Sequence, residues 1–274
     1  MTYVGSAALP GGSASRAPVR DFLGQTLAIA EVEVRKLARD PTELATRAVQ
    51  PVLWLLVFGQ VFGRLHAIPT GDLSYIEFMA PGVLAQGVLF SAIFYGIAVI
   101  WERDLGIVHK LLVSPAARAT LVLGKALAAG VRGLPQAVII FVLAAFLHVR
   151  LDFRPASLLG VAALVMLGSA TFSTFSLVVA CVVKTRERFM GIGQVLTMPL
   201  FFASNAIYPL ELMPGWLRVI ARVNPLTYLV DGLRATMISH GSSRFGLGLD
   251  YLVGLGLLTV LVLVAARLYP GLAR

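Results

Sequence analysis

The one long charged interruption in the apolar middle of this chain of 274 residues is the stretch WERDLGIVHKLLVSPAAR, from Trp101 to Arg118. Carboxylates and cations placed together suit charge-assisted bonds with a partner. The apolar positions of the stretch follow helical spacing, and Pro115 ends the run. The stretch therefore predicts a short amphipathic helix that places its charged face in water.

Residue types capable of catalysis are isolated from one another. The four histidines lack the paired spacing of a metal site, and Cys181 has no second cysteine as a partner. The chain has no H-E-x-x-H, G-x-S-x-G or G-x-x-x-x-G-K-[ST] motif, so it predicts neither a membrane protease nor a self-contained ATPase. We expect no bound metal or cofactor. An intramembrane enzyme that uses Glu77, Asp231 or His148 remains an alternative.

Composition places these residues in an integral membrane protein. Hydrophobic residues make up 58% of the chain and charged residues 14%, with a mean hydropathy of +0.84. Soluble domains carry about 25% charged residues. The net charge of +9 does not indicate nucleic-acid binding, because the basic residues flank apolar runs instead of forming one stripe.

Three regions follow from the sequence pattern. Residues 1–20 are rich in Gly, Ser, Ala and Pro and predict a disordered tail. Residues 21–41 predict an amphipathic interface helix, in which an apolar stripe faces lipid and the basic residues Arg35, Lys36 and Arg39 point away. A solvated helix that only leads into the membrane is the alternative. Residues 42–274 predict an all-α domain of six transmembrane helices.

The six expected spans are residues 48–63, 78–101, 118–150, a part of 155–183, a segment that ends near 210, and 249–266. With both termini inside the cell, fifteen Lys and Arg residues lie on the cytoplasmic side and seven outside. The charged stretch between spans two and three is then cytoplasmic. Residues 211–250 are half apolar and carry several prolines and glycines, which predicts short re-entrant helices at the outer side.

Polar and charged residues inside a membrane span cost free energy unless they are paired or face water, so their positions indicate functional or structural sites. We expect Lys125 to snorkel to the inner interface, whereas Arg132, about two turns deeper, must face protein or a wet cavity. A cavity-facing role and a structural salt bridge are both open for Arg132. The fourth span carries Ser169 and Ser173 at four-residue spacing, which favours close packing at the centre of the bundle, with a row of hydroxyls along the substrate path as the sharper alternative.

Two ordered motifs point to a family. ERDLGIVHKLLVSPAARATLVLGK, from Glu102 to Lys125, resembles the E-R-E-x-G-T-x-x-x-L-x-x-[ST]-P…G-K block of ABC-2 type exporter permeases of the daunorubicin-exporter kind. PLFFASNAIYPLELMPGWLRVIARVNPLTYLVDGLR, from Pro199 to Arg234, resembles a second signature of that family. This chain departs from the family pattern at Asp104, at Ile107 and at the pair Ser204 and Asn205.

The resemblance implies an exporter made of two permeases, this one and a second copy or a related chain, with two copies of a cytoplasmic ATPase that holds ATP and Mg. In such permeases the interface helix and the segment after span two press on the ATPase. The corresponding coupling residues here are Arg35, Lys36, Arg39, Glu102, Arg103, Asp104, Gly106, His109, Lys110 and Leu111. The translocation path or outer gate is expected at Arg132, Ser173, Asn205, Tyr208, Pro209, Pro214, Asn224 and Pro225.

We expect the exporter to move a lipophilic drug or a lipid-like molecule out of the cell, because spans one, two and five offer a mostly apolar path. Export of a polysaccharide or glycolipid is the alternative within this class, for which Phe90, Phe94 and Tyr95 would stack on sugars. A passive assembly scaffold is a further alternative, and the charged coupling block argues against it.

Overall fold

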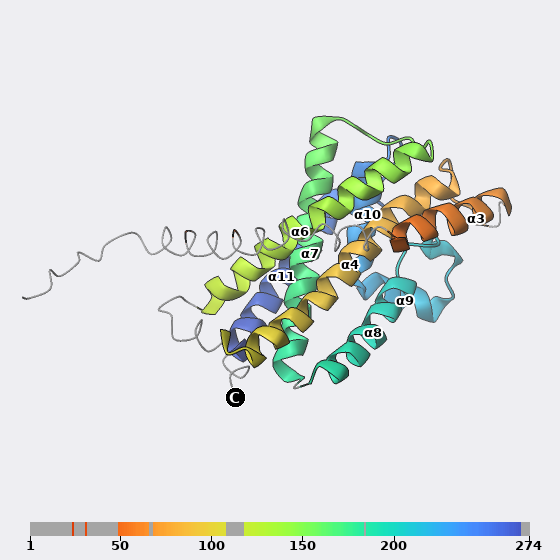
Figure 1. Cartoon of the computed structure of the whole chain (residues 1–274). Coiled ribbons are helices and arrows are strands. Elements are labelled where there is room, and N and C mark those ends of the chain that lie inside the picture. Colours follow the sequence, from red (N-terminus) through yellow and green to blue (C-terminus); the bar gives the residue numbers. More distant parts are fainter. Residues whose placement is uncertain are drawn as a thin grey trace, which may run out of the picture.

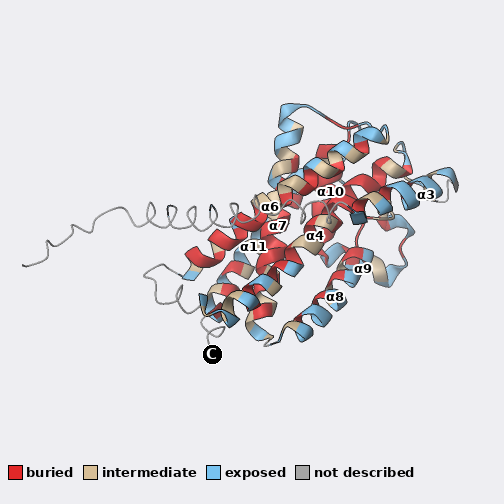
Figure 2. Ribbon diagram, viewed as in Figure 1, coloured by how far each residue is buried: buried red, intermediate tan, exposed pale blue. Residues whose placement is uncertain are grey.

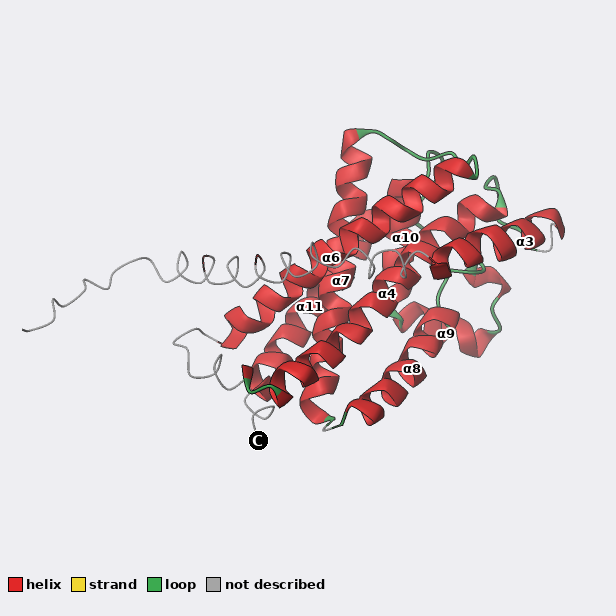
Figure 3. Ribbon diagram, in the orientation of Figure 1, coloured by secondary structure: helices red, strands yellow, loops and turns green. Residues whose placement is uncertain are grey.

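The computed structural model describes residues 24, 31, 49–65, 68–107, 118–183 and 185–269. These ranges are helical and contain no strand, apart from an isolated antiparallel bridge between Leu151 and Ile238 (Figure 3). The prediction of an all-α protein is confirmed. The expected tail, almost all of the interface helix with Arg35, Lys36 and Arg39, and the coupling residues His109, Lys110 and Leu111 lie outside the described residues.

Four helices are long and apolar enough to cross a membrane: α4 (Tyr75–Asp104), α6 (Arg118–Phe146), α7 (Pro155–Val182) and α11 (Leu247–Leu268) (Figure 1). They correspond to the expected spans two, three, four and six. The expected first span contains a π-helical segment, η1 (Trp54–Gly59), followed by α3 (Gln60–Leu65). The expected fifth span is α8 (Arg186–Phe202), which has 17 residues.

Helix α7 is central to the bundle, as its small residues predicted. It packs against α4, α6 and α11, and also against the shorter helix α10 (Pro225–Met237). A Cβ atom at Gly96 of α4 would overlap the hydroxyl of Ser176, and one at Gly133 of α6 would overlap that of Ser169. The Ser176 hydroxyl also accepts a hydrogen bond of 3.0 Å from the amide of Gly96. Small side chains therefore let α7 approach both neighbours closely.

The second helix continues further than the sequence suggested. Glu102, Arg103 and Asp104 form its last turn, so they do not begin a separate helix. The helix stops because Gly106 has φ +72°, in the left-handed region that favours glycine, and its amide bonds the Arg103 carbonyl at 2.9 Å. The boundary predicted at Trp101 followed the change in polarity, which does not terminate a helix. Residues 108–117 lie outside the described part.

The helix ends gather in two groups. We call the first group the Glu102 end; it comprises residues 101–107, 118–125, 182–183, 185–189 and 265–269. In Figure 1 the ends of α4 and α11 that belong to this group lie near the label C. The Glu77 end comprises residues 68–77, 146–155, 203–213 and 237–250. There Glu77 caps α4 through Ser74 and bonds Arg150, while hydrogen bonds from Arg154 and Ser157 hold the pKa of Asp152 well below its usual range.

Short helices do occupy the stretch after α8. A 3-10 turn, η2 (Leu210–Leu212), leads into α9 (Gly215–Val223) and then α10. Figure 2 shows α10 largely buried, whereas α8 and α9 carry long exposed faces. Asn224 begins α10 by accepting from the amide of Leu226, and its own amide nitrogen donates to the carbonyls of Leu200 and Ala203 at 2.6 and 2.8 Å. One side chain thus joins the end of α8 to the start of α10.

Candidate functional site: a central cavity and a charged helix end

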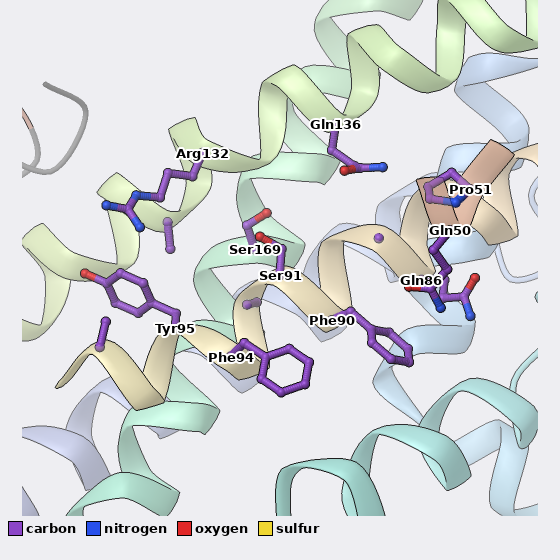
Figure 4. Close-up of a pocket in the computed structure, with 14 residues that line it drawn as sticks. Gln50, Pro51, Gln86, Phe90, Ser91, Phe94, Tyr95, Arg132, Gln136 and Ser169 are labelled. Carbon is purple, nitrogen blue, oxygen red and sulfur yellow. The ribbon is translucent and has the colours of Figure 1, made fainter. Parts of the chain in front are cut away.

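An open cavity of about 310 Å³ lies between α4 and α6, bordered also by α7 and the described residues before η1 (Figure 4). Its lining combines aromatic and small apolar side chains with a few amides, hydroxyls and one cation. The lining residues are Gln50, Pro51, Gln86, Gly87, Phe90, Ser91, Ala92, Phe94, Tyr95, Ala98, Ala129, Arg132, Gln136 and Ser169.

Helix α6 supplies the polar side of this cavity. Arg132 and Gln136 are four residues apart, so they share one face of the helix and both line the cavity. Gln136 is only 3% exposed, and its Nε2 atom has no hydrogen-bond partner among the residues that the structure describes. It fits against α4 because Gly87 has no side chain: a Cβ there would lie 2.9 Å from Gln136 Nε2.

Arg132 therefore lies at the cavity, one of the two positions that the sequence left open. Its guanidinium carbon is 5.4 Å from the centre of the Tyr95 ring, within cation–π distance. Tyr95 also faces Lys125, whose Nζ atom is 5.8 Å from the ring centre. The ring thus separates the cavity from the charged groups nearer the Glu102 end.

Helix α4 supplies the aromatic residues of the lining. In Figure 4 Tyr95 extends from α4 toward Arg132, whereas Phe90 and Phe94 project from the side of α4 that faces away from α6. These are the three rings proposed from sequence for sugar stacking, and all of them line this cavity. The space is amphipathic, and both helices contribute polar groups, because Gln86 and Ser91 of α4 also line it.

Other residues expected on the path lie elsewhere. Ser173 is buried and donates to the carbonyl of Ala170 on its own helix at 3.1 Å, so it is not part of the cavity lining. The hydroxyl of the same helix that does line the cavity is that of Ser169. Of the two serines, Ser169 lines this cavity, whereas the Ser173 hydroxyl satisfies a backbone carbonyl.

Asn205 also lies away from the cavity, in the turn after α8, where it is 2% exposed. It belongs to what we call the Asp231 cluster: Asn205, Asp231, Arg234 and Ser243. Asn205 accepts from Arg234 through its main-chain oxygen at 2.8 Å, and its side-chain nitrogen donates to Asp231 at 3.4 Å. The amide stabilises the junction between α8 and α10, and the sequence had placed it within the fifth span.

The second carboxylate oxygen of Asp231 binds the loop that leads to α11. It accepts from the amides of Arg244 and Phe245 at 2.6 and 3.0 Å and from the Ser243 hydroxyl at 3.1 Å. Arg234 lies one turn along α10, with a nitrogen 3.8 Å from Asp231 and its guanidinium carbon 3.9 Å from the centre of the Phe78 ring. The sequence analysis did not predict this pair; the i to i+3 spacing of Asp231 and Arg234 is the signal that could have indicated it.

The residues considered for an intramembrane enzyme serve separate structural roles. Both oxygens of Asp231 accept bonds within the cluster. Glu77 accepts from the Ser74 amide at 2.8 Å and from Arg150 Nε at 2.7 Å. His148 has φ 56° and ends α6. These contacts do not assemble a catalytic pair.

The expected gate residues direct the chain from α8 to α10. Tyr208 donates from its hydroxyl to the carbonyl of Phe202, and burial raises its pKa. Pro209 precedes η2, Pro214 precedes α9, and Pro225 is the first residue of α10 after its cap Asn224. They fix where the short helices begin, since proline tolerates a first helical turn.

Lys125 does not snorkel. It is 4% exposed, and its Nζ atom forms an ion pair of 2.6 Å with Glu102 Oε2, which joins the end of α4 to the first half of α6. A charge buried among helices needs such a partner, and the pairing across 23 residues could not be read from either segment alone.

A second ion pair joins α4 to α8. Asp104 binds Arg103 at 2.9 Å and Arg186 at 2.7 Å, and the Arg186 guanidinium carbon lies 3.6 Å from the centre of the Trp101 ring. Asp104 and Arg186 are each about one-third exposed. Glu102, Arg103 and Asp104, predicted as one coupling group, thus connect three helices at the Glu102 end.

Comparison with known proteins identifies the family. A model described as ABC-2 type transporter matches residues 24–238. The putative transport permease ycf38 of Cyanophora paradoxa is 30% identical over 212 residues, which cover 77% of this chain and 72% of that protein. The daunorubicin resistance ABC transporter permease protein DrrB1 of Streptomyces coeruleorubidus is 28% identical over 84% of this chain and 80% of its own length.

The inner membrane transport permease YadH of Escherichia coli K12 is 25% identical over 68% of this chain and 73% of its own. These matches agree with the motifs between Glu102 and Lys125 and between Pro199 and Arg234, and they confirm the resemblance. With four apolar helices of spanning length, this chain is a multi-pass membrane protein that belongs to the ABC-2 type transporter family.

Proposed function

We propose that this chain is the membrane subunit of an exporter that moves a lipophilic drug or lipid-like molecule out of the cell, powered by a separate cytoplasmic ATPase. Its membership of a transporter family supports the class. The printed names of two relatives speak of daunorubicin and doxorubicin resistance, which supports a hydrophobic substrate.

The amphipathic cavity is the observation that carries this proposal. The aromatic rings from α4 suit an apolar substrate body, and the few polar groups from α4 and α6 suit specific hydrogen bonds. Ligand sites in proteins combine predominantly apolar walls with a small number of placed polar groups. The path then runs between α4 and α6, with the Asp231 cluster and the short helices α9 and α10 as the outer gate.

The Glu102 end is proposed as the place where the ATPase acts. Membership of the family implies an ATPase partner and dimerisation. We propose two copies of each subunit, with ATP and Mg bound by the ATPase. The permease would have six spans, with both termini in the cytoplasm. The pair Glu102 and Lys125 ties α4 to α6. A push on the last turn of α4 is therefore transmitted to the helix that carries Arg132.

This function is tested in proteoliposomes that contain the permease and its ATPase, with daunorubicin as the probe. Glu102→Gln should leave ATP hydrolysis in place and lower the amount of drug moved per ATP, because it removes the charge that joins α4 to α6. Asp72→Asn, which likewise removes one carboxylate, on an exposed residue of the Glu77 end, is the matched control. Undiminished transport by Glu102→Gln contradicts the coupling role, and a lack of ATP-driven transport in the wild type contradicts the proposed function.

Export of a polysaccharide or glycolipid is the second candidate, favoured by the convergence of Phe90, Phe94 and Tyr95 on one cavity. Aromatic faces stack on sugar rings as well as on apolar drugs. Replacing Phe90 and Phe94 by Leu retains an apolar wall and removes the flat faces. Loss of transport for a lipid-linked sugar, with daunorubicin transport retained, would favour the glycolipid reading.

A further inference from the structure

We infer that Asp250 and Ser243 form a proton-binding site at the Glu77 end: the Asp250 carboxyl group holds a proton that it donates to Ser243 in a hydrogen bond, and the Ser243 hydroxyl donates in turn to Asp231. The proton is exchanged with water through the loop before α11, where Ser243 is half-buried and Arg244 is exposed. The site lies apart from the central cavity and does not depend on the proposed transport function.

The first observation is that a single hydroxyl lies between two carboxyl groups. Ser243 Oγ is 2.8 Å from Asp250 Oδ2 and 3.1 Å from Asp231 Oδ2, and it accepts from the amide of Gly246 at 2.7 Å. A serine hydroxyl has one proton and can accept two hydrogen bonds. It can therefore donate to only one carboxyl group. The other contact is a hydrogen bond only if that carboxyl group carries a proton of its own.

The contacts of Asp231 indicate that it is the ionised partner. Its Oδ2 atom accepts from the main-chain amides of Arg244 and Phe245 at 2.6 and 3.0 Å. Its Oδ1 atom accepts from Asn205, and a nitrogen of Arg234 lies 3.8 Å away. Several donors and a nearby cation stabilise a carboxylate. The serine hydroxyl therefore donates to Asp231.

Asp250 lacks such support. It is 2% exposed, and its Oδ1 atom has no hydrogen-bond partner in the described part of the chain. No cation among the described residues lies within ion-pair distance of it. A buried carboxylate without a cation or several donors is costly, and such a group becomes neutral instead. With a proton on Oδ2, Asp250 donates to Ser243, and each close contact of the serine hydroxyl is then a hydrogen bond.

The other titratable and charged groups around Asp250 come from α10, from α11 and from the loop between them. They are Asp231 and Arg234 of α10, His240 and Arg244 of the loop, and Tyr251 of α11. The two cations are paired, Arg234 with Asp231 and Arg244 with Glu211. His240 is exposed, and Tyr251 donates to a carbonyl of α7 at 3.1 Å. From α7, a cavity of about 20 Å³ beside Asp250 presents Thr171 and apolar side chains. None of these groups supplies the positive charge that the proton supplies.

The proton joins α11 to α10 and makes this joint sensitive to pH. When it passes to water, two carboxylates face one hydroxyl, and the bond from Asp250 to Ser243 is lost. In the unfolded chain a free aspartate releases its proton near about pH 4. Above that pH the folded protein binds one proton more than the unfolded chain does, so stability falls as the pH rises, until Asp250 ionises in the folded protein as well.

The test measures the midpoint of thermal unfolding of the full-length permease in detergent, from about pH 5 to about pH 9. Asp250→Asn places an NH₂ group where the proton-bearing oxygen was, and this group donates to Ser243 at every pH. The variant should match the wild type near the acidic end and exceed it by about 3–10 °C near the alkaline end. Asp72→Asn, an exposed residue of the same end, is the matched control and should follow the wild type throughout.

The corresponding change at the other carboxyl group places the proton. Asp231→Asn removes the ionised partner and should lower the midpoint at every pH. If Asp250→Asn is less stable than the wild type throughout, or differs from it equally at every pH, the inference is overturned. An advantage that grows with pH in Asp231→Asn instead assigns the proton to Asp231 and overturns it as well.

Infrared spectroscopy of the folded protein reads the proton directly. Over the same pH range the wild type should show the carbonyl band of a protonated carboxyl group, which disappears as the pH rises. The band should be absent from Asp250→Asn and retained in Asp72→Asn. A wild type without this band at any of these pH values contradicts the site. Neither measurement involves the ATPase or a substrate, so a failure of the proposed function leaves the proton site standing, and the reverse also holds.

Discussion

The Asp231 cluster at the Glu77 end and the Asp104–Arg186 pair at the Glu102 end contain the same residue types in opposite environments. The side chains of Asp231 and Arg234 are 2% and 8% exposed, whereas those of Asp104 and Arg186 are 35% and 34% exposed. Asp231 also accepts two main-chain amides of the loop before α11. The Glu77 end thus joins α8, α10 and α11 through buried charges, whereas at the Glu102 end the contact of α4 with α8 lies at the surface and the pair of Glu102 with Lys125, which joins α4 to α6, is buried.

The difference in burial between the two sets of ion pairs indicates which helices can move. A buried charge that loses its partner is strongly destabilising, so α8, α10 and α11 are held together at the Glu77 end. Exposed ion pairs contribute little, so the contact of α4 with α8 at the Glu102 end can open and re-form at small cost. A mechanical input at the Glu102 end would thus displace α8 relative to α4 there, with α4 and α6 moving together, and would leave the opposite end as a fixed point.

The largest expected loss of stability comes from a substitution in the Asp231 cluster at the Glu77 end. Asp231→Ala should lower the stability of the folded protein by about 3–5 kcal/mol, because Arg234 is left buried without its carboxylate. The measurement is the midpoint of thermal loss of monodisperse protein in detergent. Asp104→Ala is the control, because it makes the same substitution in the exposed ion pair with Arg186. Equal shifts for the two variants would show that the ends are fastened alike.

A steric change at the same end should have a smaller effect. A Cβ at Gly82 of α4 would overlap the carbonyl of Ala206 in the turn after α8, and backbone atoms cannot turn aside as a side chain does. Gly82→Ala should therefore cost about 1–3 kcal/mol by overpacking.

The comparison for Gly82 is Gly191→Ala on α8, where a Cβ meets nothing within 4 Å among the described atoms. That change should raise stability slightly, by up to about 1 kcal/mol, since alanine favours helix more than glycine does. Thermal midpoints of both variants in the same detergent decide the point. A harmless alanine at 82 would mean that the turn after α8 is not closely packed.

The smallest change in stability is expected at the surface pair. Asp104→Asn should alter it by only about 0.2–1 kcal/mol, the range for exposed ion pairs. Transport per ATP should nevertheless fall in proteoliposomes with the ATPase, because α8 loses its charged contact with α4. Normal coupling in this variant, at normal stability, would remove the Asp104–Arg186 pair from the proposed transmission of force.

Much of the fold was accessible from sequence because apolar runs, prolines and small residues act locally. Four of the expected spans are apolar helices of spanning length, and α7 is central, as Ser169 and its neighbours suggested. The end of α4 was misplaced, because a single glycine with positive φ, Gly106, decides it. Polarity marks the membrane boundary, whereas helix termination depends on backbone conformation.

The polar contacts were less accessible, since they join residues distant in sequence. The partner of Lys125 is Glu102, and Asn205 meets Arg234 and Asp231 across the turn after α8. The sequence marked Arg132 as a buried charge that needs an explanation. It did not identify Gln136, whose importance depends on the close approach of α6 to Gly87 of α4.

The unequal lengths of α4 and α8 have a consequence for the surrounding lipid. Helix α4 has 30 residues and α8 has 17, which correspond to about 45 and 26 Å along their axes. The core of a bilayer is about 30 Å thick, so α4 is longer than the core and its charged last turn can extend beyond it, whereas α8 is shorter. In the proposed six-span topology α8 would cross the membrane, and the bilayer would then thin beside it. We therefore expect longer-chain lipids to disfavour the arrangement at α8 and to lower the activity of this protein.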